Sequence, residues 1–202
     1  MDGWCSFYSE LKTWQTGIAA LFGLAGLAGA AFWNAQLNRQ RDKAIRDAEA
    51  NSVALALYGE MLLLQEALAR LARNTARIEN AGNQPPDDFV ETQNPVEVVV
   101  FSALADKLGL LPSEMAFAVT KFYGHLAETR IALPFIVQRH EGIRYSPIWV
   151  LEKAVAAVDG IAPTLRTIEL NSKLPEAPHP DTGLASDLIE IQREAAEEYD
   201  RR

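Results

Sequence analysis

Residues 55–78 read LALYGEMLLLQEALARLARNTARI, and this stretch decides the fold because its apolar residues recur at helical spacing. The apolar positions follow one another in steps of four and three, as the a and d positions of heptads do. They are Leu57, Met61, Leu64, Leu68, Leu71 and Ile78, with Thr75 in the remaining register position. Leu55, Leu62 and Leu63 widen the stripe beyond a two-stranded seam. The pattern therefore predicts a long helix packed in a multi-helix bundle.

Composition favours an all-α fold and excludes several classes of protein. The 202 residues include 31 alanines, 23% charged residues and one cysteine. Alanine loses little conformational entropy in a helix. A single cysteine excludes an intramolecular disulfide framework and a cysteine-rich zinc module. A net charge of −8 lacks the basic footprint of a nucleic-acid-binding protein, so no nucleic-acid partner is expected.

A second apolar stretch precedes this helix. No charged residue occurs between Lys12 and Arg39, and residues 14–33 read WQTGIAALFGLAGLAGAAFW. About twenty residues at about 1.5 Å each cross the roughly 30 Å hydrocarbon layer of a bilayer. Trp14 and Trp33 stand at the two ends, where tryptophan side chains anchor a helix at the membrane interface. The sequence therefore predicts a transmembrane helix over residues 14–33.

Two alternatives remain for the same stretch. A buried core helix would normally show a polar face, which residues 14–33 lack. A signal peptide cleaved near Ala30 would begin with basic residues, whereas this chain begins with Asp2 and Glu10 against Lys12 alone. Both alternatives are less favoured than a retained membrane helix.

Charges around the apolar stretch predict its orientation. Four basic residues follow it closely, and only Lys12 precedes it. The four are Arg39, Arg41, Lys43 and Arg46. Because lysine and arginine are retained on the cytoplasmic side, the C-terminal part is predicted to be cytoplasmic. The predicted organisation is an extracytoplasmic tail (1–13), a transmembrane helix (14–33), a charged stalk (34–51) and a helical soluble domain (52–202).

Small residues form a stripe along the predicted transmembrane helix. Ala19, Gly23, Gly26 and Ala30 follow one another in steps of four, three and four. Small residues on one face allow two membrane helices to approach closely, so a homodimer through this helix is one expectation. The alternative is that glycine and alanine simply fill an alanine-rich span. Cys5, which precedes the span, could also bridge two chains or remain a free thiol.

Proline and glycine divide the rest of the chain into shorter predicted helices. Extended connections are expected at 81–95 and 171–183, and Pro134 is expected to bend or end a helix near Arg130. The helices are predicted at 95–108, 113–130, 147–170 with a kink at Pro163, and 184–199. The predicted fold is thus all-α, with one N-terminal transmembrane helix continuing into a long helix packed in a four- to five-helix bundle.

Two further segments carry a resemblance to known proteins. The basic exit LNRQRDKAIRD (37–47) and ALADKLGLLPSEMAFAVTKFYGHL (103–126) follow the tryptophan-led apolar stretch. Together these features resemble small single-span membrane proteins of bacteria. The resemblance implies a bacterial origin and an envelope address. Because no activity is assigned to such proteins, it implies no functional residue.

No motif for catalysis, a cofactor or a metal emerges from the sequence. The three histidines, His125, His140 and His179, do not form the paired Glu-x-x-His units of metal sites in helical bundles. Phosphate-binding, dinucleotide-binding and serine-hydrolase signatures are absent from the sequence. We therefore expect no catalytic, cofactor-binding or metal-ligating residues.

The predicted function is a membrane-anchored interaction or scaffold module of the bacterial inner membrane, without catalysis of its own. Residues 78–114 carry seven acidic residues against Lys107, which favours an acidic surface open to an unidentified cytoplasmic protein partner. One alternative is a periplasmic helical binding protein released by cleavage near Ala30. A third is a membrane-tethered hydrolase or metalloenzyme.

Overall fold

The computed structural model describes residues 3–95, 97–137, 139–140, 143–144 and 146–201, with side chains for residue 14 and residues 19–95, 97–137 and 146–201. These residues are almost entirely helical, which confirms the all-α class. The elements in chain order are α1 (Gly3–Asn80), α2 (Phe89–Gln93), α3 (Val100–Leu104), the 3₁₀-helix η1 (Ala105–Leu110), α4 (Ser113–Val137), β1 (Arg139–His140), β2 (Ile143–Arg144), α5 (Ile148–Ser172) and α6 (Gly183–Asp200). The chain divides into two compact units, residues 1–48 and 49–202.

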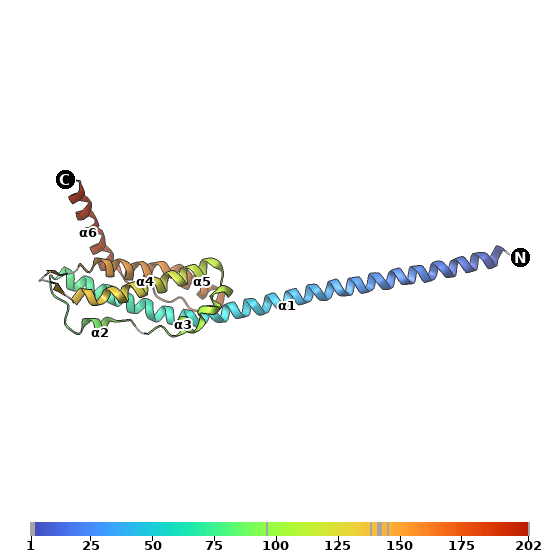
Figure 1. The fold of residues 1–202 in the computed structure, drawn as a ribbon, viewed down its shortest axis with the longest axis horizontal. Helices are drawn as coiled ribbons and strands as arrows, with labels where there is room; N and C mark the ends of the chain where they lie inside the picture. The colour runs from blue at the N-terminus through green and yellow to red at the C-terminus, as the bar shows by residue number, and fades with distance from the viewer. Residues whose placement is uncertain (1–2, 96, 138, 141–142, 145, 202) are drawn as a thin grey trace. The chain divides into compact units, whose positions relative to one another are not determined.

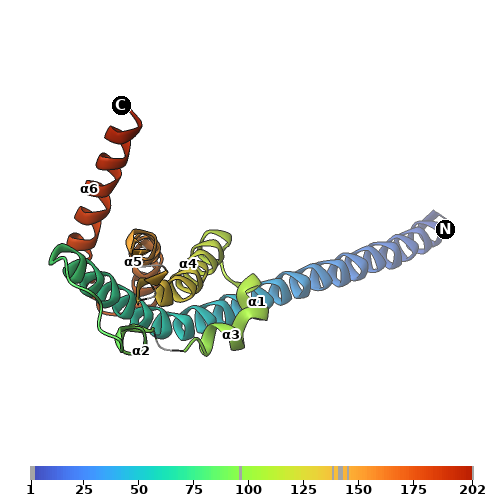
Figure 2. The ribbon, with the colours of Figure 1, turned by 60° about the vertical axis from the view of Figure 1, so that its left-hand side comes forward.

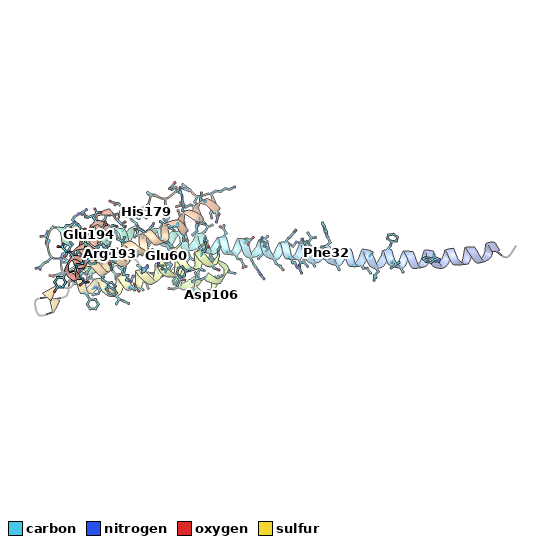
Figure 3. All side chains as sticks on the ribbon, turned by 90° about the horizontal axis from the view of Figure 1, so that it is seen from above. Phe32, Glu60, Asp106, His179, Arg193 and Glu194 are labelled. Atoms are coloured by element: carbon cyan, nitrogen blue, oxygen red, sulfur yellow. The ribbon has the colours of Figure 1, made fainter. Side chains whose placement is uncertain are left out.

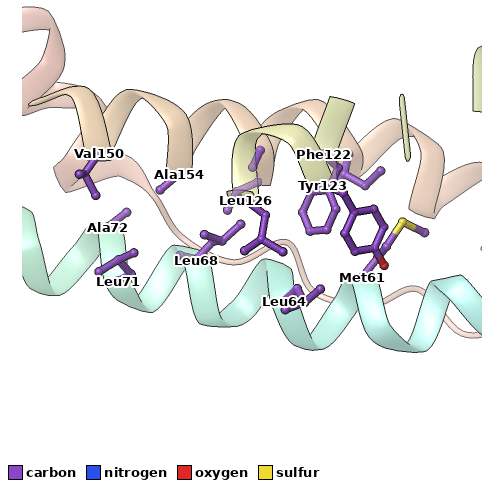
Figure 4. Close-up of a cluster of buried hydrophobic side chains, with 14 of the residues drawn as sticks. Met61, Leu64, Leu68, Leu71, Ala72, Phe122, Tyr123, Leu126, Val150 and Ala154 are labelled. Carbon is purple, nitrogen blue, oxygen red and sulfur yellow. The ribbon is translucent and has the colours of Figure 1, made fainter. Parts of the chain in front are cut away.

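The second unit is a bundle built on the C-terminal half of α1. Helices α4 and α5 lie side by side against this half, and the segment with α2 and α3 runs back along it (Figure 1, Figure 2). The predicted seam of α1 faces the interior: Leu57, Leu68 and Leu71 are fully buried. Figure 4 shows Leu64 and Leu68 of α1 facing Leu126 of α4. The heptad-like spacing therefore predicted the core-forming face of α1 correctly.

Helices α4 and α5 complete the core because their apolar residues also recur at helical spacing. Each contributes an apolar face that packs on α1 and on the other helix. The buried residues of α5 include Val150, Leu151, Ala154, Val158, Ile161, Leu165 and Ile168. Helix α6 adds Ala185, Leu188 and Ile189 from its first turns only. From Glu190 to Arg201, no side chain is buried.

The predicted helix beginning at Pro95 is wrong at its start. Residues 97–99 are not helical, and the helix begins at Val100. The physical reason is a carboxylate from a distant part of the chain. Glu60 of α1 accepts hydrogen bonds from the backbone N–H groups of Val99, Val100 and Phe101, and thus fixes where α3 starts. The connection predicted at 81–95 also contains the short helix α2.

Of the predicted bend or end of a helix near Arg130, the end is wrong, because α4 continues through Pro134 to Val137. Proline removes one backbone hydrogen bond inside a helix. Here the buried residues Leu133 and Ile136 flank the proline and hold this turn against the core. Helix α5 likewise continues through Pro163 to Ser172. The sequence His140-Glu141-Gly142 also predicts a turn, and this prediction falls partly outside the described residues.

Several apolar residues lie elsewhere than their spacing suggested. Leu63, expected to widen the α1 stripe, is 68% exposed. Trp149 follows Pro147 in the apolar helix predicted at 147–170, but its side chain is 48% exposed, whereas Phe122 and Tyr123 are buried. The spacing of Leu184, Leu188 and Ile191 predicts one apolar face for the last helix; Leu188 is buried, but Ile191 is 62% exposed. Helix α6 therefore packs on the bundle only through its N-terminal half.

Candidate functional site

The N-terminal half of α1 presents apolar side chains on all sides. Every described side chain from Trp14 to Trp33 is exposed, and Phe32 is labelled in Figure 3. The large members are Trp14, Leu21, Phe22, Leu24, Leu27, Phe32 and Trp33, each between 66% and 76% exposed. Soluble proteins rarely expose so large an apolar surface. This run is therefore the first candidate functional site.

One described helix is long and apolar enough to cross a membrane, namely Ala19–Asn80 within α1. A core helix of a soluble protein and a signal sequence satisfy the same criterion. The most apolar stretch found by that criterion is half buried. It therefore lies in the core half of α1, because no described side chain before Val53 is buried. The exposure of the earlier run, rather than its hydropathy alone, distinguishes it from a core helix.

The predicted packing and topology residues all lie on this half of α1. Ala19, Gly23, Gly26 and Ala30 are exposed. A Cβ atom built on Gly23 or Gly26 meets no atom within 4 Å, so no contact inside the chain requires glycine there. The basic residues Arg39, Arg41, Lys43 and Arg46 are exposed as well.

A cluster of hydrogen bonds in the second unit is centred on the carboxylate of Glu60. Its Oε1 accepts the N–H groups of Val99 and Val100 at 2.7 Å each, and its Oε2 accepts the N–H of Phe101 at 3.0 Å. The Tyr123 hydroxyl donates to Oε2 at 2.6 Å, and its ring stacks on Phe101 with centroids 3.9 Å apart. Glu60, labelled in Figure 3, thus ties α3 and α4 to α1.

The charge of Glu60 is stabilised by these donors. Burial acts to raise its pKa, but the hydrogen bonds from Tyr123 and from the three backbone N–H groups outweigh burial and lower the pKa. Burial and the neighbouring carboxylate raise the pKa of Tyr123 in turn. Both carboxylate oxygens of Glu60 accept hydrogen bonds from donors within the chain, which indicates a structural role.

Replacing Glu60 with glutamine is expected to lower the free energy of unfolding by about 1–3 kcal/mol at neutral pH, because an amide NH₂ would face backbone donors. Since the folded pKa of Glu60 lies below its unfolded value of about 4.3, its stabilising contribution is present above that value and is lost as pH falls through the folded pKa. Urea unfolding at several pH values measures the free energy of unfolding of both proteins. The difference in this free energy between wild type and Glu60→Gln should shrink as the pH falls. Glu91→Gln, at an exposed site on α2, is the control and should change little.

A second hydrogen-bonded carboxylate, that of the buried Glu169 of α5, holds the connection between α5 and α6. Its Oε1 accepts the Tyr58 hydroxyl at 2.9 Å and the Ala177 N–H at 3.0 Å, and its Oε2 accepts Arg166 at 3.2 Å. Burial acts to raise the pKa of Glu169, but these three donors outweigh it and lower the pKa. Burial and the carboxylate raise the pKa of Tyr58 to about 12. Arg166 also pairs with Glu176 in the connection.

A cleft of about 400 Å³ opens beside this cluster, between α1, α5 and residues 176–179. Its rim carries His179, labelled in Figure 3, whose Nε2 lies 3.3 Å from Oδ1 of Asp159. Gln65 of α1 lines the cleft and donates from Nε2 to the carbonyl oxygen of Val158 at 2.9 Å. The cleft combines these polar groups with apolar walls.

A wider groove of about 740 Å³ lies between α5 and α6. Val155, Ala156 and Ile189 contribute apolar surface to it. Its acidic residues are Glu152, Glu190, Glu194 and Glu197. Arg193 approaches Glu152 across the groove at 3.8 Å. The groove is therefore acidic, and part of α6 that lines it has no buried side chain.

One histidine of α4 belongs to an ion-pair network. His125 contacts Glu128 at 3.5 Å, and Glu128 pairs with Lys153 at 2.8 Å, which makes a surface ion-pair network. Among the residues that the structure describes, no group of three histidine, cysteine or acidic residues could hold a metal ion.

No known protein family, curated protein or solved structure matches this chain. The resemblance drawn from the sequence thus stays a prediction.

The structural roles of Glu60 and Glu169 and the presence of the cleft were not predicted from the sequence. Glu169 had a detectable signal, because it falls on the apolar face of α5 one turn after Leu165. A charged residue in an apolar stripe indicates a buried polar contact. Glu60 had no such signal, since its donors come from residues about forty positions away.

Proposed function

We propose that this protein is a membrane-anchored helical interaction module whose C-terminal domain lies in the cytoplasm and has no catalysis of its own. One observation carries the membrane part of the proposal: the apolar side chains of residues 19–33 are exposed on every face of α1. Such a helix is stable in a bilayer, because its backbone hydrogen bonds are made within the helix and the lipid tails cover apolar side chains on every face. The interfacial positions of Trp14 and Trp33 support the same assignment.

The interaction part of the proposal rests on α6 and on the groove beside it. A helical segment without buried contacts gains little from the bundle, and short isolated helices are only marginally stable in water. The segment from Glu190 onward is therefore available to a partner. The acidic groove favours a partner with a basic surface. Self-association through Ala19, Gly23, Gly26 and Ala30 is a further part of the proposal, since these residues are exposed.

Topology provides the test of the proposal. A C-terminal reporter that is active only in the cytoplasm should be active, and one that requires export should be inactive. Replacing Arg39, Arg41, Lys43 and Arg46 with glutamine should give a mixed orientation, because each basic residue opposes export by about 1–2 kcal/mol. The control replaces Arg70, Arg73, Arg77 and Lys107, which lie far from the span in sequence, and should leave orientation unchanged.

Three results would contradict the proposal. Activity of the exported reporter on the unmutated chain would place the C-terminal domain outside. A mature N-terminus beginning after about Ala30, found by N-terminal sequencing, would favour the released periplasmic binding protein instead. Stoichiometric metal in the purified protein would favour the membrane-tethered metalloenzyme.

A further inference from the structure

The cleft between α1, α5 and residues 176–179 has the size of a small-molecule site. Its volume of about 400 Å³ falls in the range of about 300–1,000 Å³ that is common for ligand pockets. Apolar surface comes from Leu62, Ala162, Pro163, Leu165 and Pro178. This surface suits an apolar body, so the polar groups around it determine which head group the ligand carries.

Most of the charged groups at the cleft are already paired. Glu169 accepts three hydrogen bonds, and Arg166 donates to both Glu169 and Glu176. Asp159 differs from them. Among the residues that the structure describes, its Oδ1 has two contacts, with His179 at 3.3 Å and with the Thr182 hydroxyl at 3.5 Å, and its side chain is half exposed. The carboxylate of Asp159 therefore has lone pairs that can accept further hydrogen bonds.

Two further acceptors belong to residues that line the same cleft. Gln65 is 97% buried, and no described residue donates to its amide oxygen, although its NH₂ group is bonded to Val158. The amide oxygen of Gln65 is therefore an acceptor that no described side chain or backbone group uses, at a residue that lines the cleft. Pro163 lies four residues after Asp159 and has no N–H to donate to the Asp159 carbonyl oxygen.

The cleft is thus rich in acceptors and has an excess of negative charge. Its carboxylates are those of Asp159, Glu169 and Glu176, against the single guanidinium of Arg166. A primary ammonium carries three donors, one positive charge and no acceptor. We infer that this cleft binds a small molecule in which a primary ammonium is attached to an apolar body, with Asp159 and Gln65 receiving the ammonium.

Binding of benzylammonium to the full-length protein in nonionic detergent tests this inference. Isothermal calorimetry should detect binding of benzylammonium but not of benzyl alcohol, which has similar shape and no charge. Asp159→Asn should weaken binding by about tenfold or more, because it removes a charged hydrogen-bond acceptor. Asp187→Asn, the same charge change at an exposed site on α6, is the matched control and should leave binding within about twofold.

A second variant removes the amide oxygen of Gln65 with little change of side-chain volume. Gln65→Met should also weaken benzylammonium binding, and thermal unfolding verifies that the variant is folded. Nα-acetyl-lysine methylamide distinguishes the source of the ammonium. Tighter binding of the lysine derivative supports a lysine side chain as the source, and tighter binding of benzylammonium supports a free amine.

Three results would overturn the inference. The first is no detectable binding of either ammonium compound at about 10 mM, a concentration that detects interactions of about 3 kcal/mol. The second is equal binding of benzylammonium and benzyl alcohol. The third is equal weakening by Asp159→Asn and Asp187→Asn, which would indicate general attraction to an acidic protein. None of these outcomes depends on the membrane anchor, so they leave the proposed function untouched.

Discussion

A variant with both Leu24 and Leu27 replaced by arginine is expected to leave the membrane fraction and to appear in the soluble fraction. Each arginine at the centre of a membrane helix opposes insertion by about 3 kcal/mol, so the pair costs about 6 kcal/mol. Both leucines are about 70% exposed, so no contact inside the chain should be lost. Flotation on a density gradient, with and without alkaline carbonate, measures the change.

The matched control places two arginines on exposed leucines of the second unit. Leu63 and Leu170 are 68% and 70% exposed, and their double replacement adds the same charge outside the proposed span. This control should remain in the membrane fraction after carbonate treatment. A wild-type protein that is released by carbonate, or a Leu24→Arg/Leu27→Arg variant that stays with the membrane, would contradict the anchor.

Leu68→Ala is expected to lower the free energy of unfolding of the bundle by about 2–5 kcal/mol. Leu68 is fully buried on α1, where it faces Leu126 of α4 in Figure 4. Removing its isobutyl group loses apolar burial and leaves a cavity, because the surrounding helices relax only partly. Urea unfolding followed by circular dichroism measures the difference in the free energy of unfolding.

Leu63→Ala is the control for this prediction. It makes the same chemical change five residues earlier on the same helix, at a position that is 68% exposed. It should alter the free energy of unfolding by no more than about 0.5 kcal/mol. Equal effects of the two substitutions would show that the face of α1 assigned to the core is wrong.

Some features could be predicted from local patterns because their physical cause is local. The spacing from Leu57 to Leu71 identifies the buried face of α1, since helix geometry alone sets which residues share a face. The extended connection around Pro178 was likewise predicted from its prolines. Its backbone from Leu174 to Asp181 is non-helical.

Other features depend on contacts between distant residues, and no local pattern reports them. Pro95 predicted a helix start, but the carboxylate of Glu60 moves that start to Val100. Pro134 predicted a bend or an end of the helix, but the helix continues to Val137, where the buried Leu133 and Ile136 hold it against the core. The cleft requires Gln65 and Asp159 to meet from α1 and α5, which is a property of packing rather than of either helix. The helices could therefore be predicted from the sequence more fully than the cap at Glu60 or the cleft.

The capping of α3 by Glu60 also has a kinetic consequence. Val99, the residue that precedes this five-residue helix, provides no side-chain cap for it. Its first hydrogen-bonded turn can therefore persist only after the chain has closed the loop of about forty residues that returns Val99 to Glu60. We expect α3 to form late in folding, after α1 has docked on α4 and α5. In native-state hydrogen exchange, the amides of Val99, Val100 and Phe101 should then exchange together, as one unit that opens before the core.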